Sequence, residues 1–460
     1  MAAASDEITG PGAARSMERT AAYAAARLAG WVRPAPGGAE TPLIAGAASP
    51  GVSVVIPSRN GRALLAAQLD GIVSDLAGVQ GEIIVADNGS SDGTAEWLRG
   101  QWPQVEIELS REPLSFAAAV NRGIGRARFS HVCLLNNDML TGPGFFSSLL
   151  QPFATVPELF CATAQIRFPP GVRREETGKA VMAQSAPEDF PIRCDEPVTG
   201  EDGTWVLYGS GGCSAYAAAK LKALGGLDEA YAPAYVEDLD LGYRAWLRGW
   251  PSVYVAGAVA EHRHRATTSR YYSGEQLATM LEVNYLRFLA RAVASPPVFR
   301  RLWRQALDRL RLRAADDPAA RVALRGAARL ALAGGRSRAA TGGAESSPGW
   351  ARLRPARLAQ SRRPLISEES LLALTDGSVA CFPGRPASGD PPALVTAAAL
   401  DRAPRESGAG GGAVLLVRVN ALHPPPAELL ARYVEIVEAR SDAALAAAAC
   451  WIRRKWSMKE

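Results

Sequence analysis

The sequence predicts an α/β domain built on a mainly parallel sheet with helices on both faces. Between residues 52 and 256, short β-branched runs alternate with segments of helical periodicity. This alternation is typical of parallel strands joined by crossover helices. Several of the runs turn polar where they end, as expected if a ligand binds beyond the carboxyl ends of the strands. The chain of 460 residues is long enough for this domain and one or two more.

Seven elements follow one another in the first half of this region. Runs of β-branched residues mark the strands, and apolar residues three and four positions apart mark the helices. The predicted elements, in chain order, are a strand at 52–56, a helix at 64–73, a strand at 83–86, a helix at 94–99, a strand at 105–109, a helix at 116–127 and a strand at 131–135.

The second half is less regular. Residues 167–203 hold many Pro, Gly and charged residues, which predicts a long excursion of the kind that forms lids and binding loops. Residues 209–216 return as a strand or turn. Asp238 is placed to cap a helix that ends at Gly249, and a strand at 253–255 follows.

Composition divides the rest of the chain. Arginine crowds the helical stretch that follows the α/β domain, a Gly/Ser/Ala/Arg/Pro-rich stretch is typical of a linker, and the last part holds short apolar runs and a helix at 426–451. The predicted segments are a disordered or weakly helical N-terminal segment at 1–50, the α/β domain at 51–295, a basic helical extension at 296–340, a linker at 341–364 and a small C-terminal region of unknown role at 365–460.

Charge and cysteine content bear on partners and compartment. The formal net charge is +5, and arginines crowd residues 300–338. Such a tract could meet anionic lipid, nucleic acid or an anionic glycan, or be a solvated basic helix. The six cysteines include no Cys-x-x-Cys pair, which fits a reducing compartment. No signal-peptide pattern and no apolar run of about 20 residues stand out, so we expect a cytoplasmic protein, at most peripheral on a membrane.

Polar residues stand at the ends of three predicted strands. The residues are Pro57, Ser58, Arg59 and Asn60 after the first strand, Asp87, Asn88 and Ser90 after the second, and Asn136, Asn137 and Asp138 after the fourth. A carboxylate such as Asp87 can accept a hydrogen bond from a pyrimidine ring or a ribose, although each cluster alone is also common in turns. The Gly-x-Gly-x-x-Gly fingerprint is absent after the first strand, which argues against an NAD enzyme.

A carboxylate pair stands at the mouth of the helix predicted after Asp238. Gly225-Gly226-Leu227-Asp228-Glu229 is followed by Glu237-Asp238-Leu239-Asp240-Leu241 and Arg244. A transferase needs such a carboxylate to hold an acceptor hydroxyl and remove its proton. Helix capping by the same aspartate is the structural alternative, and it is compatible with catalysis.

Taken in order, these motifs resemble the nucleotide-sugar-binding half of family 2 glycosyltransferases. The resemblance covers about Val52 to Asn284. Four or five such motifs in the right order, each at a strand end, are improbable by chance. The segments Leu-Leu-Asn-Asn-Asp, Gly-Gly-Leu-Asp-Glu and Glu-Asp-Leu-Asp-Leu are most similar to the rhamnosyltransferase-like branch, which builds bacterial surface polysaccharides. The resemblance implies a Rossmann-like GT-A fold.

The resemblance places a nucleotide-sugar donor at the three strand ends, with a dTDP- or UDP-linked donor favoured. Asp138 matches the last acidic position of the family's Asp-x-Asp motif, so Mg²⁺ or Mn²⁺ is the implied cofactor, although the protein ligand set is thin. His262, after the strand at 253–255, is the implied second ligand. Asn121 and Arg122 match a motif near the donor, and Arg122 is expected to pair with phosphate.

Glu237 and Asp238 match the family's catalytic carboxylates. Asp238 is implied as the general base that takes the proton of the acceptor hydroxyl, and Glu237 as the residue that orients Asp238 or the acceptor. One base, no nucleophile and direct displacement imply inversion at the anomeric carbon. Processive synthases of the family add Gln-x-x-Arg-Trp and transmembrane helices, and neither is found here. We therefore expect transfer of single sugars to a glycan or lipid-linked acceptor.

Two other classes of protein remain as alternatives. A nucleotide-sugar-binding protein that no longer catalyses would fit the reduced metal motif, but the presence of Glu237, Asp238 and His262 together argues against it. A nucleotidyltransferase would carry a glycine-rich basic loop after the first strand, and residues 57–61 match that loop poorly. No nucleic-acid partner is expected. The basic helices at 299–338 are instead hypothesised to dock on the anionic inner membrane face, near a lipid-linked acceptor.

Overall fold

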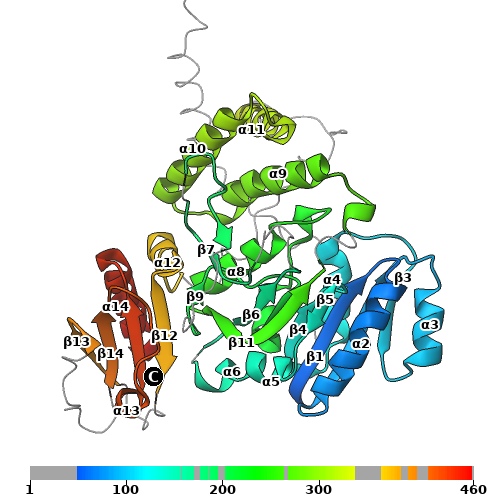
Figure 1. Ribbon diagram of the computed structural model, residues 1–460. Helices are drawn as coiled ribbons and strands as arrows, with labels where there is room; N and C mark the ends of the chain where they lie inside the picture. Colours follow the sequence, from blue (N-terminus) through cyan, green and yellow to red (C-terminus); the bar gives the residue numbers. More distant parts are fainter. Residues whose placement is uncertain are drawn as a thin grey trace, which may run out of the picture. The chain divides into compact units, whose positions relative to one another are not determined.

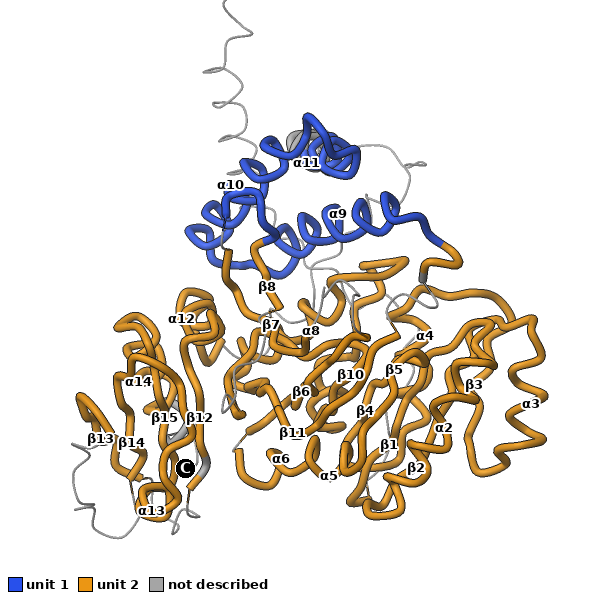
Figure 2. The backbone as a smooth tube through the Cα atoms, in the orientation of Figure 1, with its two compact units in different colours: residues 1–37, 185–190, 272–363 blue, residues 38–184, 191–271, 364–460 orange. Residues whose placement is uncertain are grey.

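The computed structural model describes residues 49–156, 158–169, 177–184, 186–194, 202–263, 268–336, 364–384, 392–400 and 413–457. Figure 2 colours its two compact units: a sheet unit of residues 38–184, 191–271 and 364–460, and a helical unit of residues 1–37, 185–190 and 272–363. The predicted N-terminal segment 1–50 and linker 341–364 lie almost entirely outside the described residues.

One nine-stranded sheet organises the sheet unit (Figure 1). Its strands are β1 Ser49–Ser58, β2 Gly81–Asn88, β3 Glu106–Ser110, β4 Phe129–Leu135, β5 Met139–Thr141, β6 Cys161–Arg167, β9 Trp205–Val206, β10 Cys213–Ala217 and β11 Ser252–His262. They lie in the order β3-β2-β1-β4-β10-β6-β11-β5, with β9 paired to β11. The first four are mutually parallel, β6 is parallel to β11, and β10 is antiparallel to both its neighbours. The predicted α/β class with a mainly parallel sheet is confirmed.

The strand order reverses between β1 and β4. From β1 the chain moves outward to β2 and β3, and it then returns to place β4 on the other side of β1. In open α/β sheets, ligands bind outside the carboxyl ends of the strands at such a switch point. Ser58 ends β1 and Asn136 directly follows β4, so the predicted polar clusters lie at this edge.

Helices cover both faces of the sheet. They are α2 Arg62–Leu76, α3 Thr94–Gln101, α4 Phe116–Arg126, α5 Phe145–Leu150, α6 Pro152–Thr155, α7 Ala218–Leu224 and α8 Glu237–Leu247. Val54, Val55 and Ile56 are all fully buried. Because successive strand residues point to opposite faces, both sides of β1 must be covered. All seven elements predicted between residues 52 and 135 are present.

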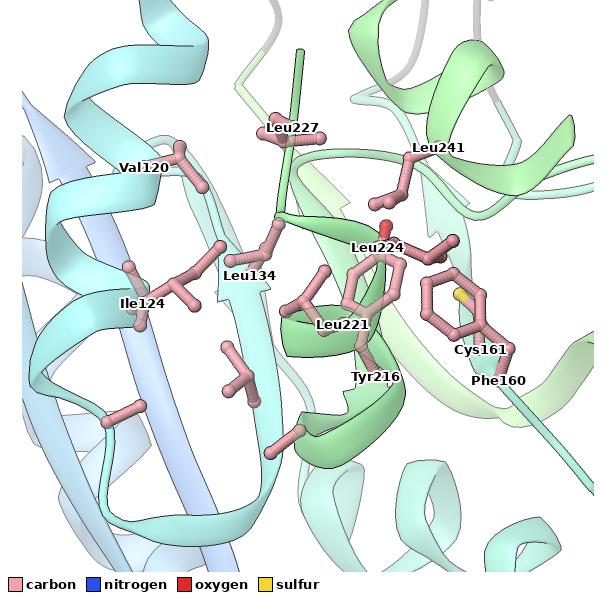
Figure 3. Close-up of a cluster of buried hydrophobic side chains, with 14 of the residues drawn as sticks. Val120, Ile124, Leu134, Phe160, Cys161, Tyr216, Leu221, Leu224, Leu227 and Leu241 are labelled. Carbon is pink, nitrogen blue, oxygen red and sulfur yellow. The ribbon is translucent and has the colours of Figure 1, made fainter. Parts of the chain in front are cut away.

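A buried apolar cluster joins α4, β4, β10, α7 and α8. Figure 3 shows its labelled members Val120, Ile124, Leu134, Phe160, Cys161, Tyr216, Leu221, Leu224, Leu227 and Leu241. Leu227 lies in the Gly-Gly-Leu-Asp-Glu segment, and Leu241 lies on the helix that carries Asp238. This core therefore fixes the backbone of both acidic motifs.

The segment 167–203 was predicted to be irregular, and its described residues contain only one short separate sheet beyond β6. This sheet pairs β7 Ala180–Val181 with β8 Arg193–Cys194. Residues 170–176, 185 and 195–201 lie outside the part of the chain that the structure describes.

The C-terminal part of the sheet unit has a second sheet of four strands. The elements are α12 Glu368–Leu374, β12 Val379–Pro383, β13 Ala393–Ala397, β14 Ala413–Arg418, α13 Ala427–Leu430, β15 Glu435–Ala439 and α14 Asp442–Ser457. The strand order is β12-β15-β14-β13. The predicted helix at 426–451 is wrong, because the β-branched run around Ile436 and Val437 pairs with β14 as a buried strand. The helix begins only at Asp442.

The helical unit contains α9 Gly274–Ala292, α10 Pro296–Arg313 and α11 Pro318–Arg336. Ser273 caps α9 in a reciprocal arrangement with Gln276. Arg309 of α10 pairs with Glu282 of α9 where both side chains are buried, and Arg313 Nη1 donates to Glu282 at 2.8 Å. These pairs set the register of α10 on α9. Within the described part of the chain, no helix is long and apolar enough to cross a bilayer.

Replacing Glu282 by alanine is expected to lower the free energy of unfolding by about 3–5 kcal/mol, since the Arg309 charge would remain buried without its carboxylate. Urea titration followed by circular dichroism measures the change. Glu275→Ala, at an exposed position of the same helix, is the matched control and should change the unfolding free energy by no more than about 0.5 kcal/mol. Equal effects of the two substitutions would contradict the structural role of the pair.

Candidate active site

A side-chain hydrogen bond joins the ends of β1 and β4. Asn137 Nδ2 donates to Ser58 Oγ at 2.9 Å, and both side chains are buried. Gly61 lies against this pair, because a Cβ there would come within 2.3 Å of Ser58 Oγ. Pro57 lies one residue earlier in β1 and pairs with Ala86 of β2. Three predicted donor-binding residues, Pro57, Ser58 and Asn137, thus lie at the switch point. Ser58 and Asn137 are joined by a direct hydrogen bond.

One carboxylate oxygen of Asp87 has no hydrogen-bond partner among the residues that the structure describes. Its side chain is only 1% exposed, and Oδ1 accepts from the Ser90 amide at 2.9 Å. Its Oδ2 makes no hydrogen bond in the described part of the chain. Ser90 Oγ in turn accepts from the Asn60 amide at 2.9 Å, which ties the turns after β1 and β2 together. A buried acceptor without a partner is costly, so Asp87 is suited to a ligand N–H or hydroxyl.

A tyrosine far along the chain completes this side of the site. The Arg59 guanidinium lies 4.1 Å from the Tyr271 ring centroid, a cation–π contact. Asn60 Nδ2 donates to the Tyr271 hydroxyl at 2.9 Å, across 211 residues of sequence. Arg270 Nη1 also donates to the Asn60 carbonyl at 2.9 Å. No sequence pattern marked these two residues, because Arg270 ends a single 3₁₀ turn, η2 Thr268–Arg270, and Tyr271 directly follows it.

Asp138 and His262 meet across the β5–β11 pairing. His262 pairs with Met139 in the antiparallel register, and its Nε2 lies 3.4 Å from Asp138 Oδ1. Both side chains are buried, and Asp138 Oδ1 makes no hydrogen bond in the described part of the chain. A buried carboxylate oxygen beside an imidazole nitrogen fits two ligands of a divalent cation. No group of three His, Cys, Asp or Glu side chains gathers among the described residues, so the remaining ligands would come from elsewhere.

Two successive glycines connect the fourth strand to helix α8. The Gly211 amide donates to Asp238 Oδ2 at 3.2 Å, and the Gly212 carbonyl accepts from the Asn136 amide at 2.8 Å. A Cβ on Gly212 would come within 2.3 Å of Asn136 Nδ2. The sequence predicted only a strand or turn here. The glycines are required because backbone and side chains approach each other closely at this point.

The start of α8 is held in an uncommon conformation. Tyr235 and Val236 both have positive φ, of 75° and 80°, and a β-branched residue rarely adopts such a value. Outliers of this kind cluster at functional sites. Val236 is the N-cap residue, so the expectation that Asp238 caps the helix is wrong. The helix begins at Glu237, and Asp238 Oδ1 instead accepts from the Leu239 amide at 2.8 Å.

The two carboxyl groups at this helix start lie in different surroundings. Glu237 is buried, whereas Asp238 is partly exposed. Burial, and after it the neighbouring charge of Asp238, raises the pKa of the Glu237 carboxyl well above its ordinary value. A raised pKa suits Glu237 for holding a proton, while the accessible Asp238 is better placed to accept one.

A polar network positions the glycine turn next to α8. Arg244 Nε donates to Asp240 Oδ2 at 2.6 Å, and Arg244 Nη2 donates to the Gly226 carbonyl at 3.0 Å. Asn121 Nδ2 donates to the Leu227 carbonyl at 2.8 Å, and its Oδ1 accepts from the Leu227 amide at 3.0 Å. Asn121 was predicted to bind the donor, but its amide is engaged in holding this turn.

Two further predicted donor-binding residues are also engaged with the protein. Asn88 bonds both backbone groups of Leu114, at 2.7 and 3.0 Å, so it organises the loop before α4. Arg122 Nε donates to Glu108 Oε1 at 2.9 Å, and its Nη2 donates to the Leu109 carbonyl at 3.1 Å. In this structure Arg122 forms an ion pair with Glu108 of β3, and its expected pairing with phosphate stays a prediction.

Comparison with known proteins agrees with these sequence motifs. Residues 50–277 match the family model described as "Glycosyltransferase like family 2". An N-acetylglucosaminyl-diphospho-decaprenol L-rhamnosyltransferase of Mycobacterium tuberculosis (strain H37Rv) is 28% identical over 214 residues, covering 41% of this chain and 68% of the relative. A validoxylamine A glucosyltransferase of Streptomyces hygroscopicus subsp. jinggangensis is 27% identical over 225 residues, covering 44% and 53%.

Among solved structures, a mannosyltransferase from Pyrobaculum calidifontis in complex with GDP-Man and Mn²⁺ is similar to this chain. The TM-score is 0.41 and the identity 18%, and the match covers 71% of this chain and 86% of that one.

Gly212→Ala is expected to reduce activity on the order of a hundredfold, because the added methyl group would displace the Asn136 side chain and the strand end that holds Asp138. Turnover and donor affinity measured at a temperature where circular dichroism shows a folded protein test this. Gly100→Ala is the control, since a Cβ there meets nothing within 4 Å. Wild-type activity in Gly212→Ala would show that the close approach is unimportant.

Glu237→Gln is expected to make the unfolding free energy less dependent on pH. Because the folded-state pKa of Glu237 is raised above the ordinary value of 4.5, its contribution is fully present below that value. It is then lost as the pH rises through the folded-state pKa. The unfolding free energy of Glu237→Gln minus that of wild type should therefore increase with pH above 4.5. Denaturant titrations at several pH values measure it, and a difference independent of pH would contradict the burial argument.

Proposed function

Residues 50–277 belong to glycosyltransferase family 2, and from this we propose that the chain transfers a single sugar, with inversion, from a nucleotide-sugar donor to a hydroxyl of a glycan or lipid-linked acceptor. The observation that carries the proposal is the pair Gly211–Gly212, which brings the accessible carboxylate of Asp238 beside the strand end that holds Asn136. A general base and a donor-binding edge are thereby adjacent.

The donor is best accommodated at the switch point. Asp87 Oδ2 offers a buried acceptor for the ring N–H or ribose hydroxyl of a pyrimidine nucleotide, so a dTDP- or UDP-linked donor is favoured. Asp138 and His262 would hold Mg²⁺ or Mn²⁺, which when bound neutralises the charge that develops on the departing nucleoside diphosphate. Arg59 lies on the same edge and adds positive charge there.

The reaction is a direct displacement. The acceptor hydroxyl gives its proton to Asp238 while its oxygen forms a bond to the anomeric carbon, and the bond from that carbon to the nucleoside diphosphate breaks. Glu237 holds a proton beside Asp238 and supports its position. Because no second nucleophile takes part, the configuration at the anomeric carbon inverts.

Release of nucleoside diphosphate from UDP-, dTDP- and GDP-sugars, with Mg²⁺, Mn²⁺ or chelator, tests the proposal. Asp238→Asn should lower turnover about 10²- to 10⁴-fold, since the base is lost, and Asp138→Ala should abolish the metal dependence. Asp70→Asn, at an exposed position of α2, should match wild type. Full turnover in Asp238→Asn would contradict the role of the base. Tight donor binding without release in any variant would support a nucleotide-sugar-binding protein instead.

The arginines of α10 form two groups with different surroundings. Arg309 and Arg313 face α9 and pair with Glu282. The exposed face instead carries Arg300, Arg301, Arg304 and Arg311, with Asp308 as the acidic neighbour that pairs with Arg311. Arg301 and Arg304 have no hydrogen-bond or ion-pair partner in the described part of the chain. The inner group is structural, and Arg301 and Arg304 of the outer group are available to an anionic surface.

Two apolar side chains of the same helical unit are also exposed. Leu312 of α10 is 61% exposed, and Val322 of α11 is 42% exposed. Arginines interspersed with protruding apolar residues suit a bilayer interface, where the charge meets anionic headgroups and the apolar group enters the acyl boundary. We therefore propose peripheral contact of these helices with the anionic inner membrane face, where a lipid-linked acceptor would be found.

Flotation with vesicles of 70% phosphatidylcholine and 30% phosphatidylglycerol tests the membrane contact. Arg301→Gln/Arg304→Gln is expected to weaken binding about 25-fold, or about fivefold per arginine, and high salt should weaken binding of the wild type. Arg99→Gln/Arg128→Gln, at two exposed arginines of the sheet unit, is the control. Equal binding to pure phosphatidylcholine vesicles, or equal loss in the control, would overturn the proposal.

A further inference from the structure

Helix α8 is held at both of its ends. At the start, Asp238 accepts from the Gly211 amide. At the end, the Leu247 carbonyl accepts from the Leu365 amide at 2.9 Å, and Gly249 lies against the Leu365 side chain, where a Cβ would come within 3.2 Å. Leu365 begins the C-terminal part of the sheet unit, the region of unknown role in the sequence, and α12 of that part also contacts α8.

Three tryptophans connect α8 to the C-terminal part. The ring centroid of Trp451, on α14, lies 4.8 Å from that of Trp205, on β9, and Trp205 lies 5.7 Å from Trp246, on α8. Both contacts are edge-to-face, an arrangement that aromatic pairs favour. All three side chains are buried, and Trp246 Nε1 donates to the Val206 carbonyl at 2.9 Å. Because these side chains are closely packed, a displacement of Trp451 would shift Trp205 and, through it, Trp246 on α8.

The second link runs through the sheets. Thr204, just before β9, forms an antiparallel bridge with Ala380 of β12, and the Cys381 amide donates to the Gly203 carbonyl at 3.3 Å. Gly203 has φ of +83°, and a Cβ there would come within 2.7 Å of the Cys381 carbonyl oxygen. The segment that starts at this bridge continues through β9 to Gly211. Both partners of the Asp238–Gly211 hydrogen bond are thus attached to the C-terminal part.

We propose that the described residues of the C-terminal part (364–384, 392–400 and 413–457) form a brace that sets the position of Asp238 against Gly211, with Trp451 as the positioning residue. The inference rests on the proposed role of Asp238 as the base. A base displaced by a fraction of an ångström loses its alignment with the acceptor hydroxyl, whereas two donor-side residues are held by contacts outside this segment. Asp87 is fixed by Ser90, and Ser58 is fixed by Asn137. The brace therefore governs the chemical step and not donor binding.

The graded series Trp451→Phe, Trp451→Leu and Trp451→Ala in the full chain tests this inference. Turnover with acceptor, donor affinity by calorimetry and the melting temperature are measured for each variant below its unfolding range. The brace predicts that Trp451→Ala lowers kcat on the order of ten- to a hundredfold with the donor Kd unchanged, that Trp451→Leu lies between, and that Trp451→Phe keeps most of the activity. If Trp451→Ala fails to fold, the other two still show whether kcat follows the loss of the ring contact.

Leu422→Ala is the control for stability alone. Leu422 is buried in the apolar cluster of the C-terminal sheet, and Trp451 is not a member of that cluster. The Leu422→Ala substitution should lower the melting temperature without changing kcat. Equal kcat in wild type and Trp451→Leu, or parallel losses of kcat and donor affinity, would overturn the brace. Absence of both turnover and donor binding in the wild type would instead refute the proposed function itself.

Discussion

The hydrogen bond from Asn137 to Ser58 joins the two strand ends on which the rest of the site is assembled. It closes the switch point between β1 and β4, where the parallel strands leave a crevice at their carboxyl ends. Asn136 and Asp138 are the residues directly before and after Asn137 in the chain. Asp138 meets His262 on one side, and Asn136 meets Gly212 on the other. The pair proposed to hold the cation and the contact to α8 thus depend on the same three residues.

Helix α8 brings a second constraint to the site. Its start is held with positive φ at Tyr235 and Val236, and such strain persists only where the surroundings over-determine the backbone. Here Arg244 and Asp240 hold the preceding glycine turn, while Leu241 anchors the helix in the core. The accessible carboxylate is therefore supported by rigid elements, which is what an acid–base group needs in order to act on a positioned hydroxyl.

Local patterns in the sequence were sufficient to predict most of the fold. β-branched runs and helical spacing gave every element from 52 to 135, because burial decides those positions. The prediction of a helix at 426–451 was wrong, because the many alanines of this stretch favour a helix and the short strand around Ile436 was not recognised. Tyr271 and Trp451 could not be predicted, because their roles come from contacts between residues far apart in sequence. Arg122 and Asn88 matched a donor-binding pattern, but nothing local reveals that Glu108 and Leu114 engage them.

In the proposed function, one site at the β1–β4 edge holds both the nucleotide and the cation. A crystal structure of the protein grown with UDP or dTDP and Mn²⁺, with the metal located by its anomalous signal, tests this most directly. The expected result is manganese bonded to Asp138 and His262 and a pyrimidine ring beside Asp87. Nucleotide and metal bound instead at the strand ends of the C-terminal sheet, near Arg418 and Asn420, would contradict it.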